Sequence, residues 1–372
     1  MYPLTVVDLF CGAGGLSAGL IRAGFSILSA IDKDPVALTT YTKNMGKHTT
    51  CIDLSMHLHD LPKPTVIVGG PPCQGFSSAG MRHQSDERNS LVRRFSSIVA
   101  HLQPTAFIFE NVEGFLTADR GRYVFDLLEP LIAMGYRIHL RKINAANYGV
   151  PQHRKRVIAI GGLGWNPSFP EPTHAAYGAP GAQLIYGSLP RTPTILDSIN
   201  DLPPPAMEPP GTPQGHLYRA LEGLDLLRAQ ALKPGQTMRD LPMHLQHKSY
   251  TRRANRRVMD GTPTDRRGGA PTGIRRLRPD EPSKAITGGA LAEFLHPLEH
   301  RSLTLRECAR LQTFPDTFTF CGTIAQQIQL IANAVPPRLA EILTRQLALD
   351  IANLNGKSET EGALLSFVPT LS

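Results

Sequence analysis

The sequence lacks the features of a disulfide-rich protein, a cysteine zinc protein and a membrane protein. Its 372 residues include only five cysteines, an odd number with no CxxC spacing, which argues against a disulfide framework and a zinc site. No hydrophobic run approaches the length that spans a bilayer, and the first residues lack the charged-then-apolar layout of a signal peptide. We therefore expect a cytoplasmic protein with reduced thiols and no metal.

Acidic residues are fewer than basic ones, and the formal net charge of +8 favours a polyanionic partner. The stretch 252–278 reads RRANRRVMDGTPTDRRGGAPTGIRRLR, with nine arginines against two aspartates. The planar fork of arginine suits phosphates and guanine edges, whereas a solvated arginine-rich face is the simpler alternative. The stretch predicts salt-sensitive binding to a nucleic-acid backbone.

Strand-like and helix-like segments alternate from Leu4 to about Gly162. Short β-branched or aromatic runs are followed by amphipathic stretches, the pattern of a parallel sheet covered on both faces. This predicts a doubly wound α/β domain. Residues 165–213 are rich in proline and glycine, which indicates a linker into a second unit. Helical periodicity returns over 304–354 and is expected to pack back on the first domain, whereas the tail after about Gly356 is predicted to be mobile.

The first predicted strand ends in DLFCGAGG, which places Gly12, Gly14 and Gly15 where a helix begins. Glycines there permit positive φ and let a ligand approach the unsatisfied amides of the helix N-terminus. The pattern is neither the GxGxxG of dinucleotide-binding proteins nor a Walker loop. A tight strand-to-helix turn without a ligand is the alternative.

Two aspartates follow later strands. Asp32 ends FSILSAID, twenty residues beyond Gly12, where a carboxylate can accept from both hydroxyls of a ribose. Asp53, in CIDL, ends the next candidate strand. Either residue alone fits a helix cap or a turn equally well. Together with the glycines, at the carboxyl edge of the sheet, they indicate a nucleoside-containing cofactor without a large phosphate group.

The segment GGPPCQGFS places Cys73 behind two prolines and two residues before a glycine. Prolines fix the backbone on one side and glycine loosens it on the other, so the thiol is positioned rather than merely packed. The preceding strand, TVIVGG, is expected to end at the same carboxyl edge. A thiol there becomes a nucleophile when its pKa is lowered, and a buried cysteine acting as a small hydrophobe is the alternative.

Two more segments bring ionisable groups to this edge. FIFENV ends in Glu110 and Asn111, and a carboxyl beside Cys73 is expected to have a raised pKa and to donate a proton. In QHRKRV, Arg154 and Arg156 are alternate residues that are expected to face the same way. A salt-bridged edge carboxylate and two solvated arginines are the simpler alternatives.

These blocks, in their order and spacing, resemble the motif series of DNA (cytosine-5) methyltransferases. The series is DLFCGAGG, GGPPCQGFS, ENVEG, QHRKRV and a late block with RECARLQTFPD and IANAVPP. The resemblance covers roughly residues 4 to 345 apart from a variable middle segment. It implies a Rossmann-like methyltransferase sheet with a second, smaller target-recognition domain. The implied division is a catalytic domain that binds S-adenosylmethionine (1–185), a DNA target-recognition domain (186–302), a return segment that completes the catalytic domain (303–352) and a mobile tail (353–372).

The resemblance also implies roles for single residues, with S-adenosylmethionine as the cofactor and no metal. Asp32 would bind the ribose and Asp53 would read the adenine amino group. The full set of implied cofactor residues is Phe10, Gly12, Gly14, Gly15, Asp32, Asp53, Pro72, Asn333 and Val335. One departure concerns Ala332, where the family usually has glycine, so that a tight turn beside the cofactor is expected to be crowded.

For catalysis and DNA binding, the resemblance implies that Cys73 is the nucleophile and that Glu110 bonds the N3 edge of the target cytosine. Arg154 and Arg156 would orient that base and the catalytic groups. The candidate DNA contacts are Gln74, Ser77 and Arg88 after the nucleophile, and Arg275, Arg276 and Arg278 in the recognition segment.

The implied reaction accounts for the position of the thiol. Cytosine C5 is a poor nucleophile, and addition of the Cys73 thiolate across the 5,6 double bond makes it enamine-like while Glu110 donates to N3. The methyl group then passes to C5, a base removes the C5 proton, and the thiolate is eliminated. Because the attacked atom is inaccessible in a duplex, the cytosine must leave the stack.

Three alternatives stay open at this point. They are an enzyme of the same fold that acts on transfer RNA, a noncatalytic DNA-binding or regulatory module, and a nicotinamide dehydrogenase, which the missing GxGxxG weakens. PPCQGFSSAG and the sizeable recognition segment favour DNA over transfer RNA. We expect a prokaryotic modification enzyme of a restriction-modification system, monomeric, with double-stranded DNA as its partner and a cognate endonuclease that need not touch it.

Overall fold

The computed structural model describes residues 4–55, 61–72, 90–179, 188–206, 214–247, 273–354 and 365–368. Within these ranges, no helix has the length and apolar character needed to cross a membrane. Four predicted site residues, namely Cys73, Gln74, Ser77 and Arg88, lie outside the described residues, as do the arginines of 252–272.

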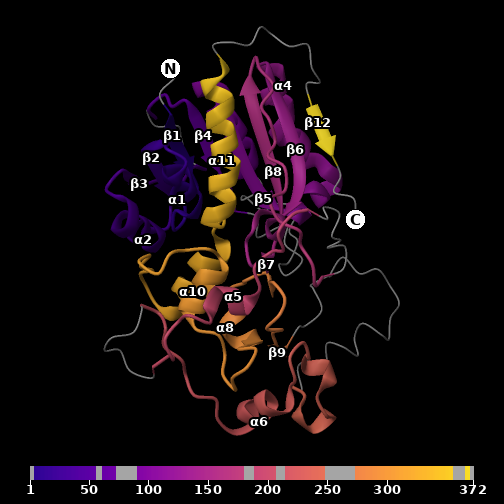
Figure 1. Cartoon of the computed structure of the whole chain (residues 1–372). Helices are drawn as coiled ribbons and strands as arrows, with labels where there is room; N and C mark the ends of the chain where they lie inside the picture. Colours follow the sequence, from indigo (N-terminus) through magenta and orange to yellow (C-terminus); the bar gives the residue numbers. More distant parts are fainter. Residues whose placement is uncertain are drawn as a thin grey trace.

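An eight-stranded sheet carries the fold, in the order β12-β6-β8-β5-β4-β1-β2-β3 (Figure 1). The strands of the sheet are β1 (Thr5–Leu9), β2 (Ser26–Asp32), β3 (Thr49–Cys51), β4 (Val66–Gly69), β5 (Ala106–Val112), β6 (Tyr136–Asn144), β8 (Lys155–Leu163) and β12 (Leu365–Val368). Neighbouring strands are parallel except at β8, which runs antiparallel to both β5 and β6. The predicted α/β class and the largely parallel sheet are confirmed.

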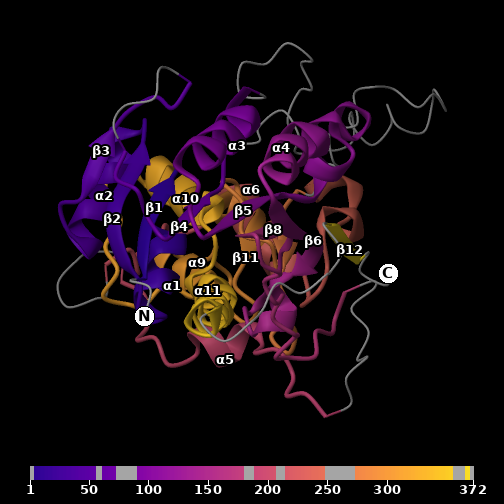
Figure 2. The same ribbon diagram turned by 90° about the horizontal axis from the view of Figure 1, so that it is seen from above.

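Helices cover both faces of this sheet. The covering helices are α1 (Gly15–Arg22), α2 (Pro35–Met45), α3 (Ser90–Leu102), α4 (Arg122–Ala133) and α11 (Pro337–Ala352). The helices α9 (Leu305–Leu311) and α10 (Ile324–Asn333) pack against each other, and α10 lies below the sheet in Figure 1. Figure 2 shows α3 and α4 on one side of the sheet and α1 and α11 on the other. Each face has its own apolar cluster, with Phe95 and Leu127 in one and Leu20 and Leu343 in the other. A third cluster, which includes Ile195, Leu311 and Ile328, lies among α9, α10 and the segment before them.

The return of the chain onto the sheet depends on a close contact between α1 and α11. A Cβ on Gly19 of α1 would lie 2.4 Å from the Cβ of Ala340 and 2.7 Å from the carbonyl oxygen of Pro337. Only glycine permits this approach. The segment after residue 303 therefore packs back on the first part of the chain, as its helical periodicity predicts.

One strand, β8, departs from the parallel pattern. The sequence patterns also leave out β6, whose residues alternate between buried and partly exposed positions and include several basic side chains. Only the short helix η4 (Ala145–Tyr148) and β7 (Gln152–His153) connect β6 to β8. Because a parallel crossover needs a dozen or more residues, this short connection returns the chain antiparallel.

One short strand lies within the segment that the sequence predicts as a tail. Residues Leu365–Val368 form β12 and pair in parallel with β6 from Ile138 to Arg141. Four residues of the tail therefore extend the sheet at its edge, where β6 offers unpaired backbone groups.

The smaller elements lie beyond the carboxyl ends of the parallel strands, below the sheet in Figure 1. They are α5 (Ile195–Ile199), α6 (Gly223–Ala231), β9 (Arg275–Arg276), β10 (Ser283–Lys284), α8 (Ala290–Glu293) and β11 (Phe294–Leu295). Part of this region has its own apolar cluster, formed by Ala229, Leu232, Met238, Leu241, Leu245 and Leu295.

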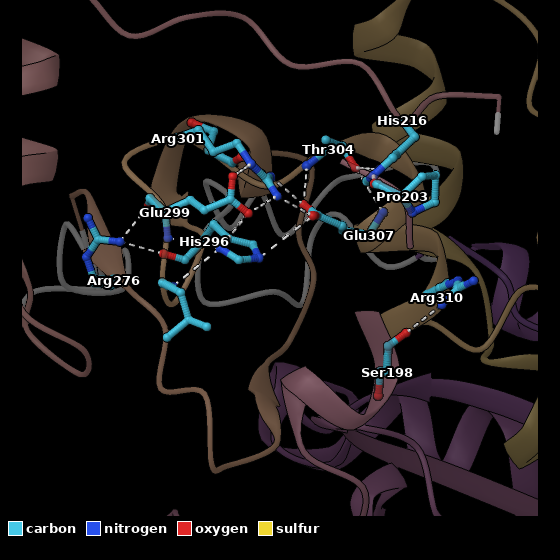
Figure 3. A network of polar contacts seen from close by, with 12 residues as sticks. Ser198, Pro203, His216, Arg276, His296, Glu299, Arg301, Thr304, Glu307 and Arg310 are labelled. Carbon is cyan, nitrogen blue, oxygen red and sulfur yellow. Dashed lines mark hydrogen bonds and ion pairs between the residues drawn. The ribbon is translucent and has the colours of Figure 1, made fainter. Parts of the chain in front are cut away.

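A buried ion-pair network joins this region to α9 (Figure 3). The guanidinium of Arg301 donates to both carboxylate oxygens of Glu307, at 2.8 and 2.9 Å, and to those of Glu299 at 3.0 Å. Burial opposes the charge of Arg301, but the hydrogen bonds to these two carboxylates outweigh it and raise its pKa. Glu307 also accepts from the backbone amide of Thr304, the N-cap residue of α9. The network therefore fixes the start of α9 relative to the segment before it.

His296 contributes a titratable group to this network. Its Nδ1 accepts from the backbone amides of Leu298 and Glu299, at 3.3 and 3.1 Å, so the imidazole is neutral in this arrangement. Burial and the nearby Arg301 lower the pKa of His296, against the opposing effect of Glu307. A histidine whose folded pKa lies below its unfolded value stabilises the fold fully above about pH 6.5, and this stabilisation is lost as the pH falls toward the folded pKa.

We therefore predict that acidification from about pH 7.5 to about pH 5.5 lowers the free energy of unfolding less in His296→Asn than in the unsubstituted protein. Asparagine offers an acceptor oxygen near the position of Nδ1 and does not titrate. Each unit of pKa difference corresponds to about 1.4 kcal/mol, and urea unfolding at the two pH values measures it. His244→Asn, at an exposed position, is the control, and an equal acid loss in all three proteins would contradict the prediction.

Candidate functional site

The predicted site residues follow neighbouring strands at the carboxyl edge of the sheet. β1 leads into Phe10 and the glycine turn, β2 ends at Asp32, β4 leads to Pro72, and β5 contains Glu110. Since β1, β2, β4 and β5 run parallel, these residues come to one edge. Open α/β sheets bind their ligands at this edge.

The glycine turn has the backbone geometry that the sequence predicts. Phe10, Gly12 and Gly14 have φ values of 59°, 53° and 89°. A Cβ on Gly14 would lie 2.7 Å from the ring of Tyr41, whereas a Cβ on Gly12 would meet nothing within 4 Å. The turn is therefore packed on one side and open at Gly12, which leaves space for a ligand against the bare backbone.

Asp32 is tied to this turn. Its Oδ2 accepts from the backbone amide of Gly12 at 2.8 Å, and its Oδ1 accepts from that of Asp34 at 2.9 Å. Burial raises the pKa of Asp32, and these hydrogen bonds oppose the rise. A carboxylate has about four acceptor sites, so Asp32 keeps acceptor capacity beside the hydrogen bonds that it accepts from the backbone of Asp34, Gly12 and Lys33. The carboxylate can therefore accept from ligand hydroxyls while it holds the turn.

Asp53 lies two residues after β3, beside the same edge. Its Oδ1 accepts from the backbone amide of Ser55 at 3.0 Å, and Lys33 Nζ lies 3.4 Å from its Oδ2. The hydrogen bond from Ser55 is the main reason that the pKa of Asp53 is lowered. Lys33 follows Asp32 directly, so this ion pair connects the ends of β2 and β3.

The late block meets the glycine turn through its backbone. A Cβ on Gly15 would lie 2.2 Å from the carbonyl oxygen of Val335, so no other residue fits there. The side chain of Val335 is buried in the cluster beneath α1 and α11, and Asn333 is exposed at the end of α10. Ala332 does not crowd a turn, since it lies inside α10 with negative φ, where alanine is well accommodated.

Three buried side chains hold the end of α10. Arg154 donates to the carbonyl oxygens of Ala332 and Ala334 at 2.7 and 3.1 Å, and also to that of Ile286. Gln312 donates to the carbonyl of Ile331 at 2.6 Å and accepts from Gln152 at the same distance. The Oε1 of Gln152 in turn accepts from the amide of Ile286. These side chains therefore connect the segment around Ile286 with the late block.

The two arginines of QHRKRV have different partners, although as alternate residues they are expected to face the same way. Arg156 Nε lies 2.8 Å from Glu110 Oε1, whereas Arg154 is buried and its guanidinium binds backbone carbonyls. The difference has a physical reason, because Arg154 lies between β7 and β8 and only Arg156 is in the strand beside β5.

Glu110 is buried beside the start of the loop that leads to Cys73. Its Oε2 lies 3.0 Å from the position of a Cβ on Gly70, the residue after β4. Asn111, fully buried, donates from Nδ2 to the carbonyl oxygen of Pro71 at 3.4 Å. These contacts fix the chain up to Pro72 against β5, immediately before Cys73, which lies outside the described residues.

Sequence reasoning missed the roles of Gln152, Gln312 and Asn111, although each stands inside a quoted block. The only sequence signal of these roles is that each polar residue stands next to a proline or an apolar residue. Such a residue is expected to be buried with partners, but its partner lies far away in the sequence.

The recognition arginines differ among themselves. Arg276 is 3% exposed and donates to the backbone carbonyls of Leu232, His296, Glu299 and Ala229. It is therefore committed to the interior, and the expectation that it contacts DNA is corrected.

The other two arginines of this segment are more accessible. Arg275 lies over the ring of Phe294, and its buried Nε has no hydrogen-bond partner among the described residues. The side chain of Arg278 is 50% exposed and pairs with Glu281 and Asp280.

Comparison with known proteins agrees with this geometry. The family model for C-5 cytosine-specific DNA methylase matches residues 4–348. The type II methyltransferase M1.HphI of Haemophilus parahaemolyticus is 34% identical over 91% of this chain and 85% of that protein. M.AgeI of Thalassovita gelatinovora, also a type II methyltransferase, is 31% identical over 94% of this chain and 100% of that protein.

Solved structures give the same fold. A crystal structure described as a DNA modification methyltransferase encoded within a prophage (E. coli) matches with a TM-score of 0.70 at 24% identity, over 94% of this chain and 99% of that one. The Dnmt2 methyltransferase of S. pombe matches with a TM-score of 0.59 at 17% identity, over 95% and 99%. The chain belongs to the C-5 cytosine-specific DNA methylase family.

Proposed function

We propose that this protein transfers a methyl group from S-adenosylmethionine to C5 of a flipped-out cytosine in a specific duplex DNA sequence, through a covalent Cys73 adduct. One observation carries the proposal. The pair of Glu110 and Arg156 lies at the same sheet edge as the glycine turn and Asp32, and the anchored Pro71 leads directly toward Cys73. A carboxyl group, a nucleophile and a nucleoside site are thus expected to share one pocket.

The chain has a suitable place for the cofactor. The open backbone at Gly12 and the remaining acceptor capacity of Asp32 fit a ribose, and Asp53 follows the neighbouring strand, β3. We assign the adenosine part to these residues, with Phe10, Gly14, Gly15, Pro72, Asn333 and Val335 around them. When bound, S-adenosylmethionine supplies a methyl group that is electrophilic because it is attached to a sulfonium.

The protein groups then divide the remaining work. Cys73 adds to C6 of the cytosine, and Glu110 donates a proton to N3, so that electron density moves to C5. Arg156 holds one oxygen of Glu110, which leaves Oε2 on the side of Gly70 and the loop that follows. A base then takes the C5 proton, the thiolate is eliminated, and the N3 proton returns to the Glu110 carboxylate, which together restore the aromatic ring.

DNA would be held by residues outside the sheet. The target cytosine must leave the duplex stack, at a cost of a few kcal/mol. We assign contacts with DNA to Gln74, Ser77 and Arg88, and to Arg275 and Arg278 in a target-recognition domain over 186–302. Arg278 is the more exposed of the last two.

The biological setting follows from the named relatives. M1.HphI and M.AgeI are type II methyltransferases, and we propose that this chain likewise serves as the modification enzyme of a restriction-modification system. It would act in the cytoplasm as a monomer, and a cognate endonuclease would cut the same unmodified sequence without needing to bind it.

Methyl transfer from labelled cofactor tests this function directly. We expect label in duplex DNA that contains the recognised site and none in transfer RNA, with C5-methylcytosine at one position of a short sequence by bisulfite mapping. Label in transfer RNA alone would replace the proposal with the transfer-RNA alternative, and no label in either substrate would contradict it.

A further inference from the structure

The side chain of Asn333, the last residue of α10, is held by a neighbour on the same helix. Gln329 Nε2 donates to Asn333 Oδ1 at 2.8 Å, and residues four apart lie on one face of a helix. The contact occupies the acceptor oxygen of the Asn333 amide. Its Nδ2 group is therefore directed away from Gln329 and can donate to a ligand.

Gln329 is itself placed by the turn at 287–289. A Cβ on Gly288 would lie 2.2 Å from Gln329 Oε1 and 3.3 Å from its Cδ, so the amide lies directly against bare backbone. The turn is closed by a hydrogen bond from the amide of Ala290 to the carbonyl of Thr287 at 3.0 Å. A side chain at position 288 would consequently displace the amide of Gln329.

Asn333 is close to the proposed cofactor turn. Ala334 Cβ and the carbonyl oxygen of Val335 lie 3.1 and 2.2 Å from the position of a Cβ on Gly15. The backbone of this segment is held by Arg154 and Gln312. The orientation of the Asn333 side chain, however, depends on the exposed contact with Gln329.

We propose that Gln329 is a positioning residue for the cofactor. It orients the Asn333 amide so that Nδ2 donates to an acceptor oxygen of the bound cofactor, and through Gly288 it connects the turn at 287–289 to the cofactor segment. The inference rests on the proposed function, in which Asn333 belongs to the cofactor site. When the donor of Gln329 is removed, the Asn333 amide is free to rotate. Loss of the hydrogen bond from Asn333 to the cofactor would then lower the affinity for the cofactor about three- to tenfold.

Calorimetric binding of S-adenosylhomocysteine without DNA tests the inference. We expect the Kd to rise about three- to tenfold in Gln329→Met, which has no donor, and to stay near the unsubstituted value in Gln329→Lys, which keeps one. Gln327→Met is the matched control, since Gln327 lies on the same helix and donates to the carbonyl of Gly322. Because Gln329 is exposed, the thermal midpoint should not change.

A double-mutant cycle with Gly288→Ala distinguishes positioning from a general effect on folding. We expect Gly288→Ala to weaken binding as Gln329→Met does, and the two together to weaken it no further. Binding by Gln329→Met equal to the unsubstituted protein, or fully additive effects, would overturn the inference. If Asn333→Ala weakens binding while Gln329→Met does not, the inference fails and the proposed function stands, whereas failure of the unsubstituted protein to bind overturns both.

Discussion

Replacement of Cys73 by alanine is expected to abolish methylation, with a loss of at least about 10⁴-fold in kcat. Without the thiolate, the cytosine ring stays aromatic and C5 is a poor nucleophile, so it does not attack the methyl group of the cofactor. A loss of this size corresponds to about 5 kcal/mol or more of transition-state stabilisation. Single-turnover methylation of a duplex that contains the recognised site measures it.

Trapping of the adduct gives the prediction a second readout. DNA with 5-fluorocytosine at the target should form a covalent complex with the unsubstituted protein, because fluorine at C5 cannot leave as a proton does. Cys73→Ala should form none. Cys321→Ala, which removes another thiol within the described part of the chain, should methylate and trap normally. Equal methylation by Cys73→Ala and the unsubstituted protein would refute the mechanism.

The parts of the site that the sequence predicts are those with local causes. Gly12 and Gly14 have positive φ, and Asp32 ends its strand. Each of these features is dictated by residues within a few positions, so a pattern of glycine, proline and β-branched residues is enough to place them. The class of fold follows in the same way from the alternation of strands and helices.

Long-range polar contacts have no such local cause. Gln152 and Gln312 are 160 positions apart, and nothing near either residue indicates the other. Arginine is equally ambiguous, since its five donors suit backbone carbonyls as well as phosphates. Arg154 and Arg276 bind carbonyls in the interior, while Arg156 pairs with a carboxylate. Sequence alone therefore located the arginines and could not assign their partners.

The direction of β8 was unpredictable for a related reason. Its residues form a buried apolar run that fits either direction. Direction depends on the length of the connection from β6, and that connection becomes visible only when β6 itself is recognised. Its basic residues, which are partly exposed, concealed it.

Replacement of Glu110 by glutamine is expected to lower kcat by about 10²- to 10⁴-fold, the usual contribution of a general acid. Glutamine keeps the shape of the side chain, and its amide oxygen can still accept from Arg156, which lies 2.8 Å from Glu110 Oε1. It holds no proton that can be transferred to N3, so electron density does not move to C5 when the thiolate adds. DNA affinity should change by no more than a few-fold, because the group acts in the transition state rather than in binding.

Glu113→Gln is the matched control for this prediction. Glu113 follows three residues later, is 47% exposed and pairs with Lys142 on β6, so its loss should leave kcat within about twofold, as expected for a surface ion pair. Arg156→Met tests the position of Glu110 separately from its proton. This variant keeps the carboxyl group of Glu110 but removes the guanidinium that holds it. If Glu110 donates the proton, Glu110→Gln should slow formation of the 5-fluorocytosine adduct as well as methylation. If Glu110→Gln forms the adduct at the normal rate but methylates slowly, Glu110 acts in a step after thiolate addition. If both rates are unchanged, Glu110 takes no part in the reaction.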